Sequence, residues 1–162
     1  MAEQLISEPS TSDQLTGVLA KIIEHKKAEV AGLQLATPLE QFIEQVVPSN
    51  NDFLAALQQP GSRFILECKK ASPSKGLIRQ HFDLAEISQV YNQFADCISV
   101  LTDEHFFQGS YQNLAKMRQL SDKPLLHKDF IIEPYQIYLG RLYGADAVLL
   151  MLSVLTDAVY QS

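Results

Sequence analysis

The feature that most constrains the fold of this chain is a series of four short apolar runs after residue 61. The stretches between them carry apolar residues three or four positions apart, as on one face of a helix. Short runs that are apolar on both faces and separated by helices are typical of parallel strands in a buried sheet. The sequence therefore predicts an α/β fold in the order β-α-β-α-β-α-β, with strands at 64–66, 97–101, 125–126 and 147–152.

The part of the chain before residue 61 has a helical pattern instead. Its apolar residues predict a first helix from about residue 12 to Gly32, with Lys26 on the polar face. Two shorter helices are expected at 38–47 and 51–57, each ended by a following proline. We therefore divide the chain into a flexible tail (1–11), an N-terminal helical extension (12–60) and an α/β unit (61–162).

Composition excludes several classes of protein. With 46% hydrophobic residues the chain is too apolar to be disordered, and its net charge of -6 argues against a dedicated nucleic-acid-binding protein. The longest apolar stretch, 147–155, is too short to cross a membrane, and the N-terminus has no signal-peptide pattern. We expect a cytoplasmic protein whose two cysteines, Cys68 and Cys97, are small core residues without a disulfide.

Charged residues follow the predicted strands at their C-terminal ends. Glu67 and Lys69 end the first strand, and Lys128 ends the third. In parallel α/β folds these ends meet at the edge where sites form, and alternation places Glu67 and Lys69 on one face and Cys68 on the other. Two lysines beside a carboxylate suit a phosphorylated or carboxylated ligand. Each also has a structural explanation, since Glu67 could simply pair with Lys69, and Lys128 with Asp129.

Other candidate sites are weak. The segment 71–76 contains hydroxyls, a glycine and a lysine, but it lacks both glycine-rich nucleotide-binding patterns, so we expect an ordinary surface loop. The four histidines have no metal-ligand spacing: His25 lies on a polar helix face, His81 and His105 in loops, and His127 away from the side of Lys128. We expect neither a metal ion nor a cofactor.

Four segments around the predicted strands carry recognisable motifs in a consistent order: ILECKKASPSKG at 65–76, SVLTDEHFFQGS at 99–110, LHKDFIIEPYQI at 126–137 and GADAVLL at 144–150. Together they resemble the indole-3-glycerol phosphate synthase family over about residues 14–162. The resemblance implies a (βα)₈ TIM barrel preceded by extra helices. It also implies an enzyme of tryptophan biosynthesis that needs no cofactor. The reaction closes the indole ring of 1-(2-carboxyphenylamino)-1-deoxyribulose 5-phosphate with loss of CO₂ and water.

The resemblance also implies roles for individual residues. Lys128 would be the general acid that protonates the substrate carbonyl. Lys69 would bind the anionic substrate and assist dehydration, and Glu67 would hydrogen-bond a substrate hydroxyl and orient the lysines. The remaining substrate-binding residues would be a loop serine and an apolar wall for the anthranilate ring: Ser72, Phe107, Phe130 and Leu149.

The chain is short for such a barrel, which needs about 250 residues. It reaches only the fourth strand, so a catalytic glutamate on the fifth strand and a phosphate site after strands seven and eight would lie outside it. We expect a barrel truncated to the helical extension and about four βα units, inactive alone and self-associating through open sheet edges. Its open face is expected to carry Ile65, Val100, Leu126 and Leu149, or their neighbours.

Several alternatives remain open from the sequence. The chain could be a complete four-stranded domain, a non-catalytic half-barrel that serves as an assembly module, or a flavodoxin-like binding domain. The last of these would not explain the two lysines. Some members of the family carry a fused phosphoribosylanthranilate isomerase barrel, and the sequence does not decide whether the parent protein does.

Overall fold

The computed structural model describes residues 17–161, so the predicted tail and the start of the first helix lie outside the described residues. Helix α1 (Gly17–Ala36) is followed by two 3-10 turns, η2 (Leu39–Gln41) and η3 (Ile43–Gln45), and by helix α2 (Phe53–Leu57). The single helix predicted at 38–47 is wrong. Phe42 breaks it with a φ of -132°, outside the helical range, and its side chain is buried.

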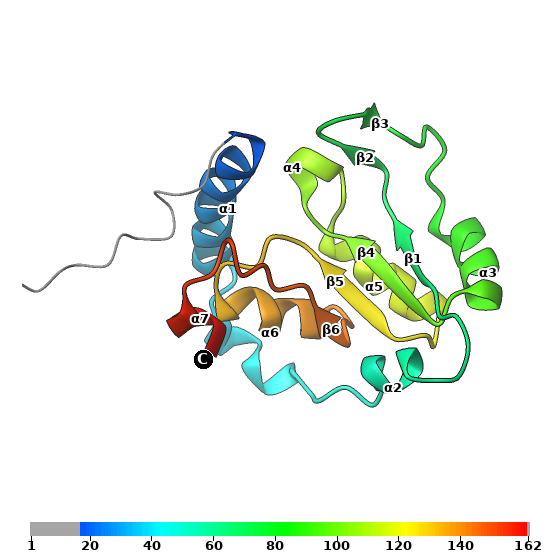
Figure 1. The fold of residues 1–162 in the computed structure, drawn as a ribbon. Helices are drawn as coiled ribbons and strands as arrows, with labels where there is room; N and C mark the ends of the chain where they lie inside the picture. The colour runs from blue at the N-terminus through cyan, green and yellow to red at the C-terminus, as the bar shows by residue number, and fades with distance from the viewer. Residues whose placement is uncertain (1–16, 162) are drawn as a thin grey trace, which may run out of the picture.

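Four parallel strands form the main sheet in the order β1-β4-β5-β6 (Figure 1). The strands are β1 (Ile65–Cys68), β4 (Cys97–Leu101), β5 (Leu125–Lys128) and β6 (Ala147–Val148). The helices that follow or separate them are α3 (Leu84–Phe94), α4 (Glu104–Phe107), α5 (Tyr111–Leu120), α6 (Pro134–Leu142) and α7 (Asp157–Gln161). The predicted α/β order is confirmed. No helix within 17–161 has the length and apolarity that a bilayer crossing requires.

The segment after β1 is more ordered than the surface loop we expected. Residues Ala71–Ser72 (β2) and Gly76–Leu77 (β3) form a two-stranded antiparallel hairpin in which Ser72 pairs with Gly76. Gly76 has a φ of +62°, a conformation that residues with a side chain rarely adopt. This hairpin fixes the position of Ser72 beside the end of β1.

The fourth strand is shorter than the predicted run of 147–152. Strand β6 has a single neighbour in the described part of the chain, β5, which ends at Lys128. Its last contact with β5 is a long hydrogen bond of 3.4 Å, donated by the amide of Leu149 to the carbonyl oxygen of His127. Residues beyond Leu149 therefore have no ladder to join, although they are apolar enough for a strand.

The main core lies between the sheet and helices α3 and α5. Ile98, Val100 and Leu125 of the sheet pack there against the helices, together with Leu84, Ile87, Leu114 and Met117. On β4 the open face carries the neighbours of Val100, Ser99 and Leu101, and not Val100 itself. Val100 pairs with Cys68, and both side chains point to the helices.

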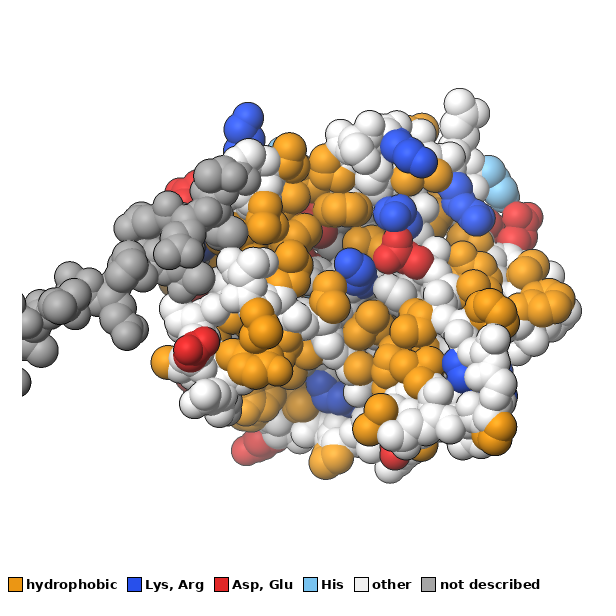
Figure 2. Space-filling view, viewed as in Figure 1, with side chains coloured by type: hydrophobic (Ala, Val, Ile, Leu, Met, Phe, Trp, Pro, Cys, Tyr) orange, Lys and Arg blue, Asp and Glu red, His pale blue; other side chains and the backbone are white. Residues whose placement is uncertain are grey.

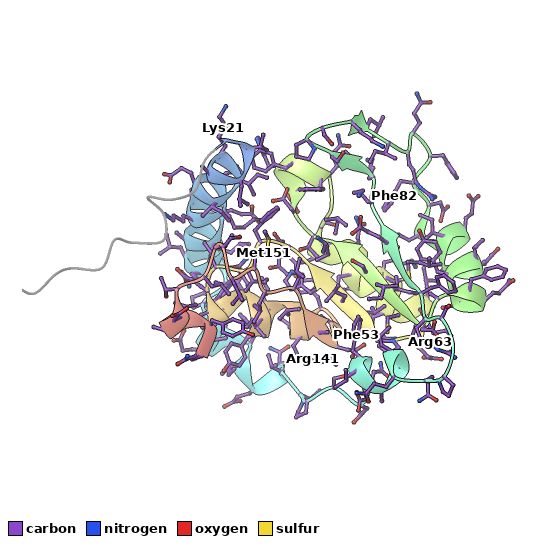
Figure 3. The ribbon with its side chains drawn as sticks, in the orientation of Figure 1. Lys21, Phe53, Arg63, Phe82, Arg141 and Met151 are labelled. Atoms are coloured by element: carbon purple, nitrogen blue, oxygen red, sulfur yellow. The ribbon has the colours of Figure 1, made fainter. Side chains whose placement is uncertain are left out.

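The opposite face of the sheet carries the alternate residues. Ile65 is 44% exposed there, Leu126 is half-buried, and Cys97, Ser99 and Leu101 are buried. At the N-terminal end of β4, helix α2 covers the sheet: the Cys97 thiol lies 3.8 Å from the carbonyl oxygen of Phe53, which is labelled in Figure 3.

Helix α1 is fixed to the α/β unit by a second apolar cluster. Val30 of α1 and Phe42 pack there with Tyr111, Tyr135 and Leu139. The Tyr135 hydroxyl donates to two carbonyl oxygens at the end of α1, those of Leu33 (3.2 Å) and Thr37 (2.9 Å). These hydrogen bonds join α6 to the C-terminal end of α1 and to the residue that follows it. The attachment of α1 therefore does not depend on charged residues alone.

The carboxylate of Asp146, just before β6, connects several elements. It accepts hydrogen bonds from Arg118 (2.8 Å), from Arg141 of α6 (2.9 Å), from the backbone amide of Leu125 (2.8 Å) and from Ser49 (2.5 Å). Burial would raise the pKa of this carboxyl, but the hydrogen bonds and the arginine charge outweigh it and hold the pKa below its usual value. Asp146 thus joins the segment before α2 to the sheet.

Candidate active site

A lysine and a glutamate form an ion pair at the end of β1. The Lys69 ammonium lies 2.7 Å from a carboxylate oxygen of Glu67, and each side chain is about one third exposed. Cys68, between them in the sequence, is buried on the helix side of the sheet, as the alternation predicts. An ion pair this exposed contributes little to stability. Because both side chains are partly exposed, the ammonium of Lys69 and the carboxylate of Glu67 remain accessible to a bound anion or hydroxyl.

Lys128 occupies the last position of β5. Its backbone is held by the neighbouring strand, since the amide of Thr102 donates to the Lys128 carbonyl oxygen at 3.1 Å. Its side chain is half-buried and forms no ion pair with any residue from 17 to 161. The structural alternative, a pair between Lys128 and Asp129, is wrong, because Asp129 pairs with Lys26.

Strand register relates Lys128 to the pair on β1. Glu67 lies opposite Ser99, and Lys128 lies opposite Leu101, two residues further along the same strand. Side chains two residues apart share a face, so Glu67 and Lys128 lie on the same face, with β4 between them. Figure 2 shows basic and acidic side chains gathered near the centre of this view, among hydrophobic ones.

An open cavity lies beside the Glu67–Lys69 pair. It has a volume of about 680 Å³, and its lining includes Lys69, Ser72 and Phe107. Val18 of α1 also lines it, so the N-terminal helix reaches the site. The rings of Phe107 and Phe130 lie 6.1 Å apart between centroids, which makes them neighbours.

Leu149 is half-buried and directly follows β6, on the far side of β5 from the cavity. Of the seven residues expected at the site, three line this cavity. Another cavity of about 810 Å³ lies between α1 and α4, around His25 and Phe106, but none of the seven residues lines it.

Comparison with known proteins assigns the chain to a family. The sequence model described as "indole-3-glycerol phosphate synthase" matches residues 19–162. The chain belongs to the indole-3-glycerol phosphate synthase family.

Curated relatives support this assignment. The chain is 52% identical over 149 residues to "Tryptophan biosynthesis protein TrpCF" of Vibrio parahaemolyticus, a match covering 92% of the chain and 31% of the relative. The protein of the same name in Salmonella typhi is 54% identical over 144 residues, covering 89% of the chain and 32% of the relative. "Indole-3-glycerol phosphate synthase" of Rippkaea orientalis is 51% identical over 145 residues, covering 86% and 50%.

The chain therefore spans about a third of the length of the TrpCF proteins and half of the Rippkaea synthase. The indole-3-glycerol phosphate synthase family folds as a TIM barrel, and the four parallel strands with their helices correspond to part of such a barrel.

The histidines of this family member are mostly as expected. His127 is fully buried, and its Nε2 atom lies 2.9 Å from the Thr102 hydroxyl. His105 differs from the expectation, because it lies in the short helix α4 and stacks on His25 of α1 at 4.2 Å between ring centroids.

Within residues 17–161, one group of three side chains has the composition of a metal site. His81, Asp83 and Glu86 bring potential ligand atoms within 4.8 Å of one another. Asp83 caps α3 by accepting from the amides of Ala85 and Glu86, and His81 pairs with Glu86 at 3.1 Å. These contacts account for the cluster without an ion.

A buried charge cluster that the sequence pattern did not predict lies beside the site. Lys26 is fully buried, so its expected place on a solvated helix face is wrong. Its ammonium lies 2.9 Å from carboxylate oxygens of Glu29, Asp103 and Asp129. The sequence contains a signal of this burial. Lys26 follows Ile22 by four residues and precedes Val30 by four, which places Lys26 on the apolar stripe of α1.

The cluster changes the ionisation of its members. Burial alone would lower the pKa of Lys26, but the charges of Asp129 and Asp103 outweigh it and raise that pKa. Burial would raise the pKa of Asp129, but nearby His127, the Lys26 charge and the Thr102 hydroxyl hold it well below its usual range. The pKa of Glu29 is raised, mainly by burial.

Proposed function

We propose that this chain supplies the first part of the active site of an indole-3-glycerol phosphate synthase in tryptophan biosynthesis. The substrate would be 1-(2-carboxyphenylamino)-1-deoxyribulose 5-phosphate, converted with loss of CO₂ and water. The observation that supports this most is the Lys128 ammonium, which pairs with no carboxylate among residues 17–161 and shares a face with the Glu67–Lys69 pair.

Lys128 is the proposed general acid. Ring closure joins the ring carbon that bears the substrate carboxylate to the ketone carbon of the sugar, and the ketone oxygen then takes a proton. An ammonium at a strand end, with its backbone fixed by Thr102, can donate that proton. CO₂ then leaves the ring carbon, and its bonding electrons restore the aromatic ring.

Lys69 and Glu67 would act on the anionic groups and hydroxyls of the substrate. Lys69 would bind the substrate's negative charge and assist loss of the new hydroxyl as water. Glu67 would accept a hydrogen bond from a substrate hydroxyl and keep Lys69 in place through the 2.7 Å ion pair. The lining of the open cavity by Lys69 supports its contact with a ligand.

The substrate's aromatic ring needs an apolar surface. Phe107 and Phe130 would provide it, with Leu149 directly after the next strand, β6, and Ser72 contributing a hydroxyl from the hairpin. The remaining groups of the site, including the phosphate-binding loops, would come from barrel units beyond residue 162.

A fused second enzyme is also proposed for the parent protein. The matched segment is 31% of the Vibrio TrpCF protein but 50% of the Rippkaea synthase, so the TrpCF proteins have additional chain. A phosphoribosylanthranilate isomerase barrel would account for that length. Sequencing the gene 3′ of codon 162 tests this: a stop codon soon after one completed barrel would contradict it.

A hybrid enzyme provides the test of the main proposal. In this hybrid, residues 1–162 are followed by the part of the Vibrio parahaemolyticus relative that directly follows its match and completes the synthase barrel, without the additional chain. We expect it to form indole-3-glycerol phosphate, detected by its fluorescence. A folded hybrid without turnover, beside an active Vibrio parent, would overturn the proposed function.

A non-catalytic half-barrel module is the second candidate. It is favoured by the open face of the sheet, where Ile65 is 44% exposed, and by the absence of a second neighbour for β1 and β6 within 17–161. Turnover by the hybrid would exclude it, because an assembly module need not place Lys69 and Lys128 productively.

A further inference from the structure

The buried lysine of α1 connects two strand ends that carry site residues. Lys26 lies 2.9 Å from Asp103, which follows β4, and 2.9 Å from Asp129, which follows β5. All three side chains are fully or almost fully buried. One ammonium therefore holds together two carboxylates that belong to different βα units.

Each carboxylate also fixes the segment that carries an aromatic residue of the site. Asp129 accepts from the amide of Phe130 at 2.8 Å. Asp103 accepts from the amide of Phe106 at 2.7 Å and so caps α4, the helix that ends in Phe107. The chain also places Asp129 directly after Lys128. A shift of either carboxylate would consequently move Lys128 or one ring of the Phe107–Phe130 pair.

The lysine is needed to keep the two carboxylates close. Without it, two buried negative charges would face each other, and charges of the same sign in a poorly hydrated site repel strongly. Thr102 donates to the Asp129 carboxylate and His127 lies beside it, but these contacts involve Asp129 and not Asp103, so they do not replace the lysine between the two carboxylates.

Attachment of α1 does not by itself explain a lysine at this position. The apolar cluster around Val30 and the hydrogen bonds from Tyr135 already hold the helix. Buried ion pairs seldom stabilise a fold more than apolar side chains of similar size would. The arrangement is better explained by the geometry that it imposes on the two strand ends.

We propose that Lys26 is a positioning residue for indole formation, acting through Asp103 and Asp129 on Phe107, Lys128 and Phe130. The proposal rests on the proposed function of the site. It assigns the N-terminal helix a part in the reaction, although the ammonium of Lys26 is buried away from the substrate.

The first test compares neighbouring lysines of α1 in the hybrid enzyme. Lys26→Met is expected to lower kcat/KM by about 10- to 100-fold, because displacing reactive groups by about 1 Å has effects of this size. KM should rise as well as kcat fall, since the aromatic wall shifts together with Lys128. The exposed Lys27→Met is the matched control and should stay within about twofold of the unchanged enzyme.

A readout independent of turnover separates positioning from loss of folded protein. In Lys26→Met, the amides of Phe106 and Phe130 should exchange with solvent deuterium at least about 10-fold faster, because their carboxylate partners move. Amides of the apolar cluster, such as Leu139, should exchange as before. Unchanged exchange at Phe106 and Phe130 would overturn the proposal, whether or not the hybrid turns over substrate. A hybrid that lacks turnover would, by that result, contradict only the proposed function.

A double variant tests the electrostatic cause. Lys26→Met with Asp103→Asn removes one of the two negative charges and retains a capping side chain for α4. We expect the double variant to recover at least about a third of the decrease in log kcat/KM that Lys26→Met causes. If Lys26→Met does not fold, the same exchange and KM measurements are made on Lys26→Met/Asp103→Asn and on Asp103→Asn alone. Loss of kcat at unchanged KM, with native exchange, would mean fewer folded molecules and would contradict positioning.

Discussion

Glu67 and Lys128 lie on the same face of the parallel sheet, separated by the single strand β4. Each sits at or beside the C-terminal end of its strand, the edge at which TIM barrels carry their sites. Glu67 is paired with Lys69, whereas Lys128 pairs with no charged residue within 17–161. Lys128 is therefore available for chemistry, whereas Lys69 is held by the Glu67 carboxylate.

The buried carboxylates predict a loss of stability in acid. The pKa values of Asp129 and Asp146 are lowered in the folded chain from a value of 3.8. Carboxyls with a lowered pKa bind fewer protons folded than unfolded, so their stabilisation is present above about pH 4 and is lost as pH falls through the folded values. Urea unfolding should therefore give a lower free energy at about pH 3 than at about pH 6.

Asp146→Asn provides the control for this pH dependence. It should destabilise the chain at about pH 6 and make the decline between about pH 4 and pH 2 shallower. At the alkaline end, the raised pKa of Lys26 implies that its stabilisation is present below 10.5 and lost as pH rises beyond that value. Equal acid slopes for the variant and the unchanged chain would contradict the role given to Asp146.

Two helical glycines predict opposite effects of the same substitution. A Cβ at Gly140 of α6 would lie 2.4 Å from Nδ1 of the buried His127, whereas a Cβ at Gly32 of α1 meets nothing within 4 Å. Gly140→Ala should therefore lower the free energy of unfolding by about 1–3 kcal/mol through overpacking. Gly32→Ala should raise it by about 0.5–1 kcal/mol through helix propensity. Chemical denaturation measures both, and stabilisation by Gly140→Ala would contradict the close approach of α6 to β5.

The polypeptide of residues 1–162 is predicted to be inactive by itself and to self-associate. Its edge strands β1 and β6 each lack a second neighbour within 17–161, and the open face carries Ile65 and the half-buried Leu126. Light scattering should give a mass above 18.1 kDa, and product fluorescence should stay at background. A stable monomer that forms product would contradict the proposal that further barrel units complete the site.

The sequence predicted the α/β order and the short helix at 51–57 well, because apolar periodicity and helix-ending prolines are local properties. It failed where tertiary contacts decide. Residues 150–152 are apolar enough for a strand, but β5 ends at Lys128 and offers them no partner. Phe42 breaks a helix because its side chain enters the core.

The candidate site, like the fold, was predictable where local sequence patterns decide and not where tertiary contacts decide. Strand ends and alternation were enough to choose Glu67, Lys69 and Lys128, whereas the resemblance was needed for the aromatic wall. Lys26 was placed in solvent because lysines are mostly exposed, and its partners Asp103 and Asp129 lie far along the chain. A lysine on the apolar stripe of a helix can be recognised as an exception only once those distant carboxylates are brought next to it.

The most direct test of the account is product formation by the hybrid enzyme and its Lys128→Met variant in a single turnover. We predict that the unchanged hybrid forms indole-3-glycerol phosphate and that Lys128→Met lowers the rate by about 100-fold or more, because a general acid is lost. Substrate affinity should change less than about threefold, since the proton is needed only as the transition state forms. An unchanged rate, or a loss of affinity as large as the loss of rate, would contradict the general-acid role of Lys128.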